Sequence, residues 1–168
     1  MSMLRTRRAA VATTMLVLVA SASAPPAARA LDLTGTWAGR QTCTEFDGGR
    51  TMYVLEGTLE VTQSGATLGI TFMSAGHEDG YVGRAVVDDG NRDRGEIVLL
   101  HCGTNDVAGD AHFDEVGRLK VSTKPAEGTG RISGTSIFSN PLPASVGSCR
   151  WSFNRVATDD PGARTICP

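Results

Sequence analysis

Apolar and polar residues alternate with a period of two over much of the chain after residue 30. The clearest case lies between residues 53 and 72, where the apolar set changes from odd to even positions across a Ser-Gly pair. Its apolar members are Tyr53, Leu55, Leu59, Val61, Ala66, Leu68, Ile70 and Phe72. This is the pattern of two half-buried strands joined by a two-residue turn at Ser64-Gly65. The turn places Val61 opposite Leu68 and Leu59 opposite Ile70, with all four side chains on one face.

Similar short alternating segments follow along the rest of the chain, separated by turn-rich sequence such as DDGNRDRG and NPLPAS. Many short antiparallel strands without helical periodicity predict an all-β fold, either a barrel or a sandwich. No internal repeat is found, and we expect residues 31–168 to form a single domain. With the hairpin, strands at residues 35–44, 81–88, 95–102, 116–123, 130–138 and 147–156 give about eight in all.

Residues 1–30 have the composition of a signal peptide. Arg5, Arg7 and Arg8 precede an apolar stretch, and Ala28-Arg29-Ala30 is an A-x-A cleavage site. The apolar stretch is shorter than the roughly 20 residues that cross a bilayer, so we expect no membrane anchor. We predict a secreted or periplasmic protein that begins at Leu31, and export by either the general or the twin-arginine route stays open.

Removal of this segment makes the protein acidic. It takes away four of the 16 basic residues and none of the 18 acidic ones, which leaves a net charge of −6. Binding to nucleic acid depends on a basic surface that neutralises phosphates. We therefore expect no nucleic-acid partner.

Four cysteines remain after residue 30, and all of them are expected to form disulfide bonds. They are Cys43, Cys102, Cys149 and Cys167. An even number in an exported chain predicts two disulfides, and no pair has the C-x-x-C spacing of a redox or zinc site. Three connectivities are possible.

The first and last predicted strands carry complementary inward faces. These are Trp37, Gly39, Gln41 and Cys43 in the first strand, and Cys149, Trp151, Phe153 and Arg155 in the last. If the two strands close a barrel with Cys43 beside Cys149, small residues meet large ones and Arg155 packs over the indole of Trp37. Opposed cysteines also lie within disulfide reach. We therefore favour Cys43–Cys149 and Cys102–Cys167, with the other connectivities left open.

The segments LTGTW and CRWSFNR together resemble the two ends of a calycin chain, the superfamily of lipocalins, fatty-acid-binding proteins, avidins and several small bacterial inhibitor barrels. The resemblance implies an up-and-down barrel in which Gly35 and Trp37 match the G-x-W motif and Arg155 is the cation across the tryptophan. A sandwich that begins with a core tryptophan is the alternative. Biotin binding is not expected, because AGRQTC after Trp37 lacks the Asn and Ser that avidins place there.

Four inward polar or aromatic residues are the candidates for ligand binding. They are Gln41, Tyr53, Tyr81 and Trp151. Amphipathic aromatic side chains often line small-molecule sites. The alternative is that these side chains fill a barrel too narrow to hold a ligand.

No pattern predicts a metal, a cofactor or a catalytic residue. Asp110, His112 and Asp114 share one face if their segment is a strand, and His77, Glu78 and Asp79 form a cluster, but neither group has the spacing of a metal site. The loop at 88–96 resembles a calcium loop only in part, and a hairpin connection explains it better. No serine sits in a G-x-S-x-G setting.

We predict a non-catalytic exported barrel that binds a small apolar ligand or a protein partner. A periplasmic inhibitor of a protease or lysozyme, inserting the NPLPASVG loop, is one alternative, and an enzyme with an unrecognised site is another. A ligand binder predicts a cavity of at least about 300 Å³ lined by Tyr53, Tyr81 and Trp151. An inhibitor predicts a filled interior and a protruding apolar loop, whereas an enzyme predicts converging polar groups with shifted pKa values.

Overall fold

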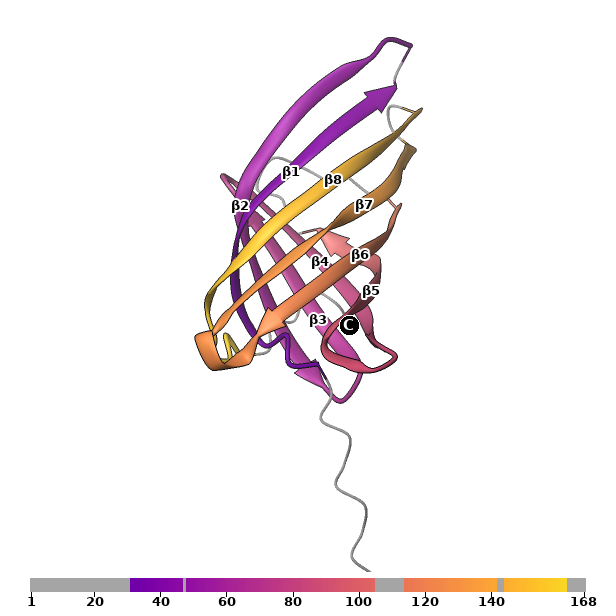
Figure 1. Cartoon of the computed structure of the whole chain (residues 1–168). Coiled ribbons are helices and arrows are strands. Elements are labelled where there is room, and N and C mark those ends of the chain that lie inside the picture. The colour runs from indigo at the N-terminus through magenta and orange to yellow at the C-terminus, as the bar shows by residue number, and fades with distance from the viewer. Residues whose placement is uncertain (1–30, 47, 105–113, 142–143, 163–168) are drawn as a thin grey trace, which may run out of the picture.

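The computed structural model describes residues 31–46, 48–104, 114–141 and 144–162. The predicted signal peptide at residues 1–30 lies outside them, as do Asp110, His112 and Cys167. The described chain forms eight strands and one short 3-10 turn (Figure 1). The elements are β1 (Gly35–Phe46), β2 (Thr51–Ser64), β3 (Thr67–Ser74), β4 (His77–Asp88), β5 (Asn91–Thr104), β6 (Asp114–Lys124), η1 (Pro125–Glu127), β7 (Thr129–Pro141) and β8 (Ala144–Ala157).

Each strand pairs antiparallel with the next, and β8 pairs back onto β1 to close the barrel. This confirms the predicted all-β, up-and-down architecture with eight strands and excludes the sandwich. Strands extend further than predicted at several ends. For example, β5 begins at Asn91 rather than at residue 95, because only Asp89 and Gly90 connect it to β4. The segment that resembled a calcium loop is therefore a hairpin connection.

The seam between β1 and β8 has the predicted register. Trp37 pairs with Arg155, Gly39 with Phe153, Gln41 with Trp151 and Cys43 with Cys149. Cys43 and Cys149 form a disulfide with their Cα atoms 4.0 Å apart. The prediction of two disulfides is confirmed for this bond alone, because Cys167 lies outside the described residues and its pairing with Cys102 stays a prediction.

The hairpin of β2 and β3 corrects the predicted register by two residues. Val61 pairs with Ile70, and Ser64 pairs with Thr67, so the turn is at Gly65-Ala66 rather than Ser64-Gly65. Gly65 has a φ of 61°, and a positive φ at the first central residue is what a type II′ turn needs. A shift of two keeps every side chain on its predicted face, so the hydrophobic pattern does not separate the two registers.

Trp37 closes one end of the barrel, called the base here, with the help of Leu31 and Leu33. Both leucines are buried, and the Trp37 indole N–H donates to the Leu33 carbonyl at 3.1 Å. Gln63 holds this segment in place, since its side chain accepts from the Leu33 N–H and donates to the Leu31 carbonyl, each at 2.8 Å. The chain before β1 is therefore a plug inside the base.

Arg155 lies across the ring of the same tryptophan, as predicted. Its guanidinium carbon is 4.6 Å from the centre of the Trp37 ring, and one Nη donates to the Asp32 carbonyl at 2.6 Å. Burial lowers the pKa of Arg155, while the nearby Asp32 opposes that shift. The stacked cation and the plug together seal the base.

Gly35→Ala is expected to lower the free energy of unfolding by about 2–3 kcal/mol. Gly35 has a φ of 133°, and a Cβ there would lie 2.2 Å from the Ala157 carbonyl oxygen. Gly90→Ala is the matched control, because Gly90 has a φ of 83° with no atom near its Cβ position. It should cost only backbone strain, about 1 kcal/mol. Equal losses in urea denaturation would show that the contact with Ala157 is unimportant.

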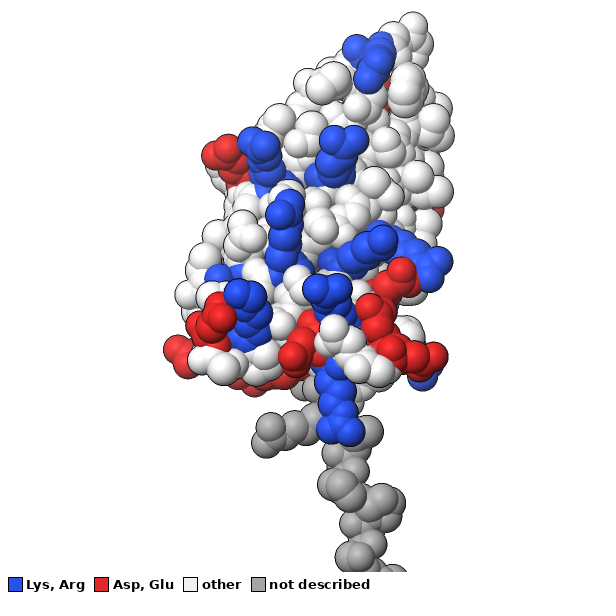
Figure 2. Space-filling model, in the orientation of Figure 1, with Lys and Arg blue, Asp and Glu red and all other residues white. Residues whose placement is uncertain are grey.

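The outer surface has an uneven distribution of charge. On the face shown in Figure 2, charged side chains gather toward the base, and the surface toward the opposite end is mostly uncharged. A groove of about 530 Å³ lies on the outside of the barrel among the exposed side chains of Phe46, Leu100, Val116, Ile137 and Val146. We refer to these five residues as the outer groove.

Candidate functional site: a cup at the open end of the barrel

A cavity of about 410 Å³, which we call the cup, opens at the end of the barrel opposite Trp37. Its lining comes from six strands and the turn between β3 and β4. The lining includes Gln41, Cys43, Glu45, Tyr53, Leu55, His77, Asp79, Tyr81, Glu115, Phe138, Asn140 and Cys149. The volume is within the range of small-molecule sites in proteins.

The cup ends where large aromatic side chains fill the interior. The rings of Phe72 and Phe153 meet edge to face with centres 5.9 Å apart, and Trp151 lies 5.4 Å from Tyr81. These residues separate the cup from the plugged base. The barrel is therefore packed in its lower part and hollow in its upper part.

Three of the four candidate binding residues line the cup. Gln41 in β1, Tyr53 in β2 and Tyr81 in β4 do so, whereas Trp151 in β8 lies beneath the surface and is buried. The structure thus brings all four side chains to one end of the barrel interior but places Trp151 under the floor.

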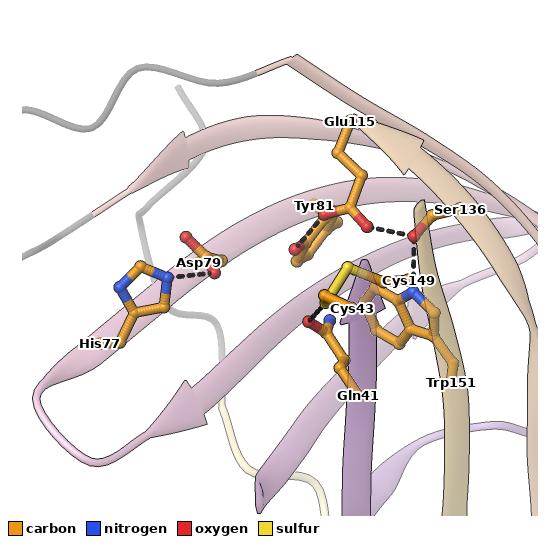
Figure 3. Close-up of a disulfide and its surroundings, with 9 residues drawn as sticks. All are labelled: Gln41, Cys43, His77, Asp79, Tyr81, Glu115, Ser136, Cys149 and Trp151. Atoms are coloured by element: carbon orange, nitrogen blue, oxygen red, sulfur yellow. Dashed lines mark hydrogen bonds and ion pairs between the residues drawn. A yellow bond between two sulfur atoms is a disulfide. The ribbon is translucent and has the colours of Figure 1, made fainter. Parts of the chain in front are cut away.

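A chain of hydrogen bonds converges on Glu115 in β6 (Figure 3). The Tyr81 hydroxyl donates to Glu115 Oε2 at 2.8 Å, and the Ser136 hydroxyl donates to Oε1. The Trp151 indole N–H donates to Ser136 Oγ at 2.8 Å. All these donors are neutral, so the carboxylate has hydrogen bonds but no opposite charge among them.

Burial controls the ionisation of these groups. Desolvation raises the pKa of Glu115, and the hydrogen bonds from Ser136 and Tyr81 offset only part of that shift. The pKa of Tyr81 is raised well above its ordinary value, mainly by burial and next by the nearby carboxylate of Glu115. Burial and Glu45 raise the pKa of Tyr53 to about 12. Both tyrosines therefore stay neutral near pH 7 and present intact hydroxyl groups.

Glu115→Gln is expected to gain stability relative to the wild type as the pH rises. Because the pKa of Glu115 is raised in the folded state, the folded protein holds the proton more tightly than the unfolded chain. Wild-type stability therefore falls as the pH rises from 4.5, the ordinary value, through the raised pKa. The neutral amide does not titrate, so the difference in free energy of unfolding should grow by up to about 1.4 kcal/mol per pH unit in that window.

Urea denaturation between pH 4 and pH 8 measures this difference. Val156→Gln is the control, because Val156 is exposed and has no ionisable group, and its profile should run parallel to that of the wild type. A parallel profile for Glu115→Gln would mean that burial does not shift the pKa of Glu115.

A second carboxylate, Asp79, lies on the cup lining between two histidines. His77 Nε2 is 2.9 Å from Asp79 Oδ2, and His101 Nε2 is 3.8 Å from Oδ1. The Asp79 side chain is buried, with only 3% of its surface exposed. Among the residues that the structure describes, no group of three or more His, Cys, Asp or Glu side chains could hold a metal ion.

Gln41 presents an amide to the cup without hydrogen-bond partners for its nitrogen. The residue is only 3% exposed, and Nε2 has no partner in the described part of the chain. Its Oε1 lies 4.0 Å from Cys43 Sγ, which has no hydrogen to donate because it is bonded to Cys149. The amide lies close enough to Tyr81 to oppose part of the rise in its pKa, but without the geometry of a hydrogen bond.

Several cup residues were not among the predicted site residues, and the alternation could have found them. In β6, Leu119 and Val121 set the inward phase, and counting back by two leads to Glu115. Val116 faces outward instead, although it is apolar. The same count from Ile132 in β7 leads to Ser136. Ser136 is buried, donates to Glu115 and does not itself line the cup.

A scan against models of known protein families finds no match to this chain, and a search of curated proteins finds no similar sequence. The closed barrel of eight antiparallel strands is consistent with a calycin-like fold. No helix among the described residues is long and apolar enough to cross a membrane. The functional proposal therefore depends on the geometry of the cup.

Proposed function

We propose that this protein is an exported, non-catalytic barrel of the calycin type that binds a small organic molecule in the cup. The cup itself is the observation that carries the proposal, because a volume of about 410 Å³ in an otherwise packed barrel is room for a ligand. The closed end, with Trp37 under Arg155, supports the calycin assignment. The Cys43–Cys149 bond supports export, since disulfides persist in oxidising compartments.

The inhibitor alternative loses the element on which it was based. Pro141 pairs with Ala144, so all of the NPLPASVG segment except residues 142 and 143 belongs to β7 and β8. The interior is also hollow at the open end rather than filled. Both observations favour a ligand in the cup over an inserting inhibitor loop.

The enzyme alternative has one supporting observation, the raised pKa of Glu115 on a cup with several polar groups. A binding role explains the same arrangement, because the donors of Tyr81 and Ser136 hold Glu115 in one orientation. A ligand recovered chemically unchanged from the cup supports binding, whereas turnover of that ligand would overturn the non-catalytic proposal.

Native mass spectrometry of the protein purified from its own host tests the proposal. We expect a small molecule to co-purify with the wild type and to be lost from Leu55→Trp, because Leu55 lines the cup and an indole there would fill it. Val54→Trp is the matched control, since Val54 is the next residue and is exposed on the outside. Wild-type protein that carries no small molecule would overturn the proposal.

A protein partner is the second candidate, and the outer groove is the observation that favours it. Its five exposed apolar side chains form a continuous cleft, which is typical of interaction surfaces. In the same experiment this candidate predicts a co-purifying protein that is lost from Ile137→Lys and kept by Leu55→Trp. Loss of a small molecule from Leu55→Trp supports the first proposal, and loss of a protein from Ile137→Lys supports the second.

A further inference from the structure

We propose that the ligand of the cup is a small protonated amine that also carries a hydroxyl or carbonyl oxygen. This inference rests on the proposed function and specifies the chemistry of the ligand. The amine pairs with the carboxylates of the cup, and the oxygen accepts a hydrogen bond from Gln41.

The described part of the cup lining contains carboxylates but no lysine or arginine. Glu45 in β1 and Glu115 in β6 have only neutral hydrogen-bond donors, whereas the third carboxylate, Asp79 in β4, already lies against His77 and His101. Glu45 accepts a hydrogen bond from Ser145, and Glu115 accepts from Tyr81 and Ser136. These hydrogen-bond donors fix the carboxylates in place without neutralising them. An anionic ligand would be repelled, and a cation would supply the missing opposite charge.

Gln41 is the independent sign that a polar ligand belongs in the cup. A buried amide N–H without a partner costs free energy, and such groups are rare in folded proteins. Gln41 Nε2 is in this condition on the cup lining. A purely apolar ligand would leave Nε2 without a partner and would also cover Glu45 and Glu115 without supplying a group of opposite charge. An oxygen on the ligand satisfies Nε2, and the Gln41 carbonyl is available to the ammonium group.

The remaining lining suits the body of such a molecule. Tyr53, Tyr81 and Phe138 supply aromatic surface, and Leu55 supplies aliphatic surface. Aromatic faces attract an organic cation and also pack against an aryl or alkyl group. The cup therefore combines an acidic side, one unpaired amide and apolar walls, which together match an amino alcohol or amino ketone with a ring or short chain.

Three probes of nearly equal shape test the charge preference. They are 2-amino-1-phenylethanol, which is a cation near pH 7, 1-phenylethane-1,2-diol, which is neutral, and mandelate, which is an anion. Isothermal titration calorimetry at pH 7 with full-length mature protein measures each affinity. We expect the amine to bind at least about tenfold more tightly than the diol, because it forms charge-assisted hydrogen bonds. Mandelate should show no saturable binding.

Variants then assign the effect to residues. Glu115→Gln should reduce the preference of the amine over the diol to less than about threefold, whereas Glu127→Gln, which removes the same charge at the base, should leave it unchanged. Gln41→Leu should weaken both the amine and the diol by about three- to tenfold, because both use their hydroxyl oxygen. Leu55→Trp should abolish binding of both. If Glu115→Gln does not fold, the wild-type comparison and Gln41→Leu still decide the question.

Each outcome bears on one proposal. If the diol or mandelate binds as tightly as the amine, the cup takes small molecules and the proposed function stands, but the inference of a cationic ligand is overturned. If the amine binds best yet Leu55→Trp has no effect, the amine binds elsewhere and the inference is also overturned. If none of the three binds at millimolar concentration, the inference fails, and the native mass spectrometry decides the proposed function independently.

Discussion

Replacing Trp37 with alanine is expected to lower the free energy of unfolding by about 3–5 kcal/mol. The indole is fully buried, and its removal leaves a cavity at the base of the barrel, beside the plug of Leu31 and Leu33. Arg155 would lose the ring under its guanidinium, and the Leu33 carbonyl would lose a hydrogen-bond donor. The loss of stability is large because one substitution removes buried apolar surface, leaves a cavity and deletes the cation–π contact with Arg155.

Urea denaturation followed by far-ultraviolet circular dichroism measures the effect. Trp37→Phe should show a smaller loss, because it keeps an aromatic ring but not the indole N–H. Val156→Thr is the control in the neighbouring strand, since Val156 is 63% exposed and should change stability by no more than about 0.5 kcal/mol. A loss for Trp37→Ala as small as that of the control would contradict the role given to the base.

Removing the Cys43–Cys149 bond by the double change Cys43→Ala and Cys149→Ala is expected to lower the free energy of unfolding by about 2–5 kcal/mol. The two cysteines are 106 residues apart, so the bond closes a long loop and restricts the unfolded chain strongly. Both sulfur atoms are buried in the wall of the cup, and their loss also removes packing.

The same measurement under reducing conditions separates the two contributions. Reduction breaks the bond in the wild type, so its advantage over the double variant should shrink to the packing of two thiols. An unchanged difference would mean that the stability comes from packing and not from the cross-link. The comparison is sound whether or not Cys102 and Cys167 are bonded, because both proteins keep that pair.

The seam shows how far alternation alone can predict this fold. The inward sets of the first and last strands, ordered by residue size and anchored by one cysteine each, led to the correct register because only one alignment opposes Gly39 to Phe153 and Cys43 to Cys149. In the hairpin of β2 and β3, by contrast, two registers differ by two residues and bury the same side chains. Gly65 has a positive φ and is the first central residue of the observed turn, whereas the prediction placed it second.

The cup was harder to predict than the barrel, for a physical reason. Alternation identifies inward positions by their apolar neighbours, and near the open end the inward positions are polar. Glu115 was passed over because the adjacent Val116 is the apolar residue, although Val116 faces outward. Tyr81 was chosen as an amphipathic aromatic residue, and Gln41 and Tyr53 were found because the alternation had set the inward phase of their strands. Trp151 shares that phase, but its depth depends on side-chain packing that a strand pattern does not contain.

The pairing of the first strand with the last also orders the events by which the molecule is made. Cys149 can meet Cys43 only after the 106 positions that separate them have been synthesised, and the bond persists only where the surroundings are oxidising. The Cys43–Cys149 bond therefore forms only in molecules in which β1 and β8 have come together. Molecules in which Cys43 still reacts with a thiol-specific reagent are those caught before the cylinder has shut.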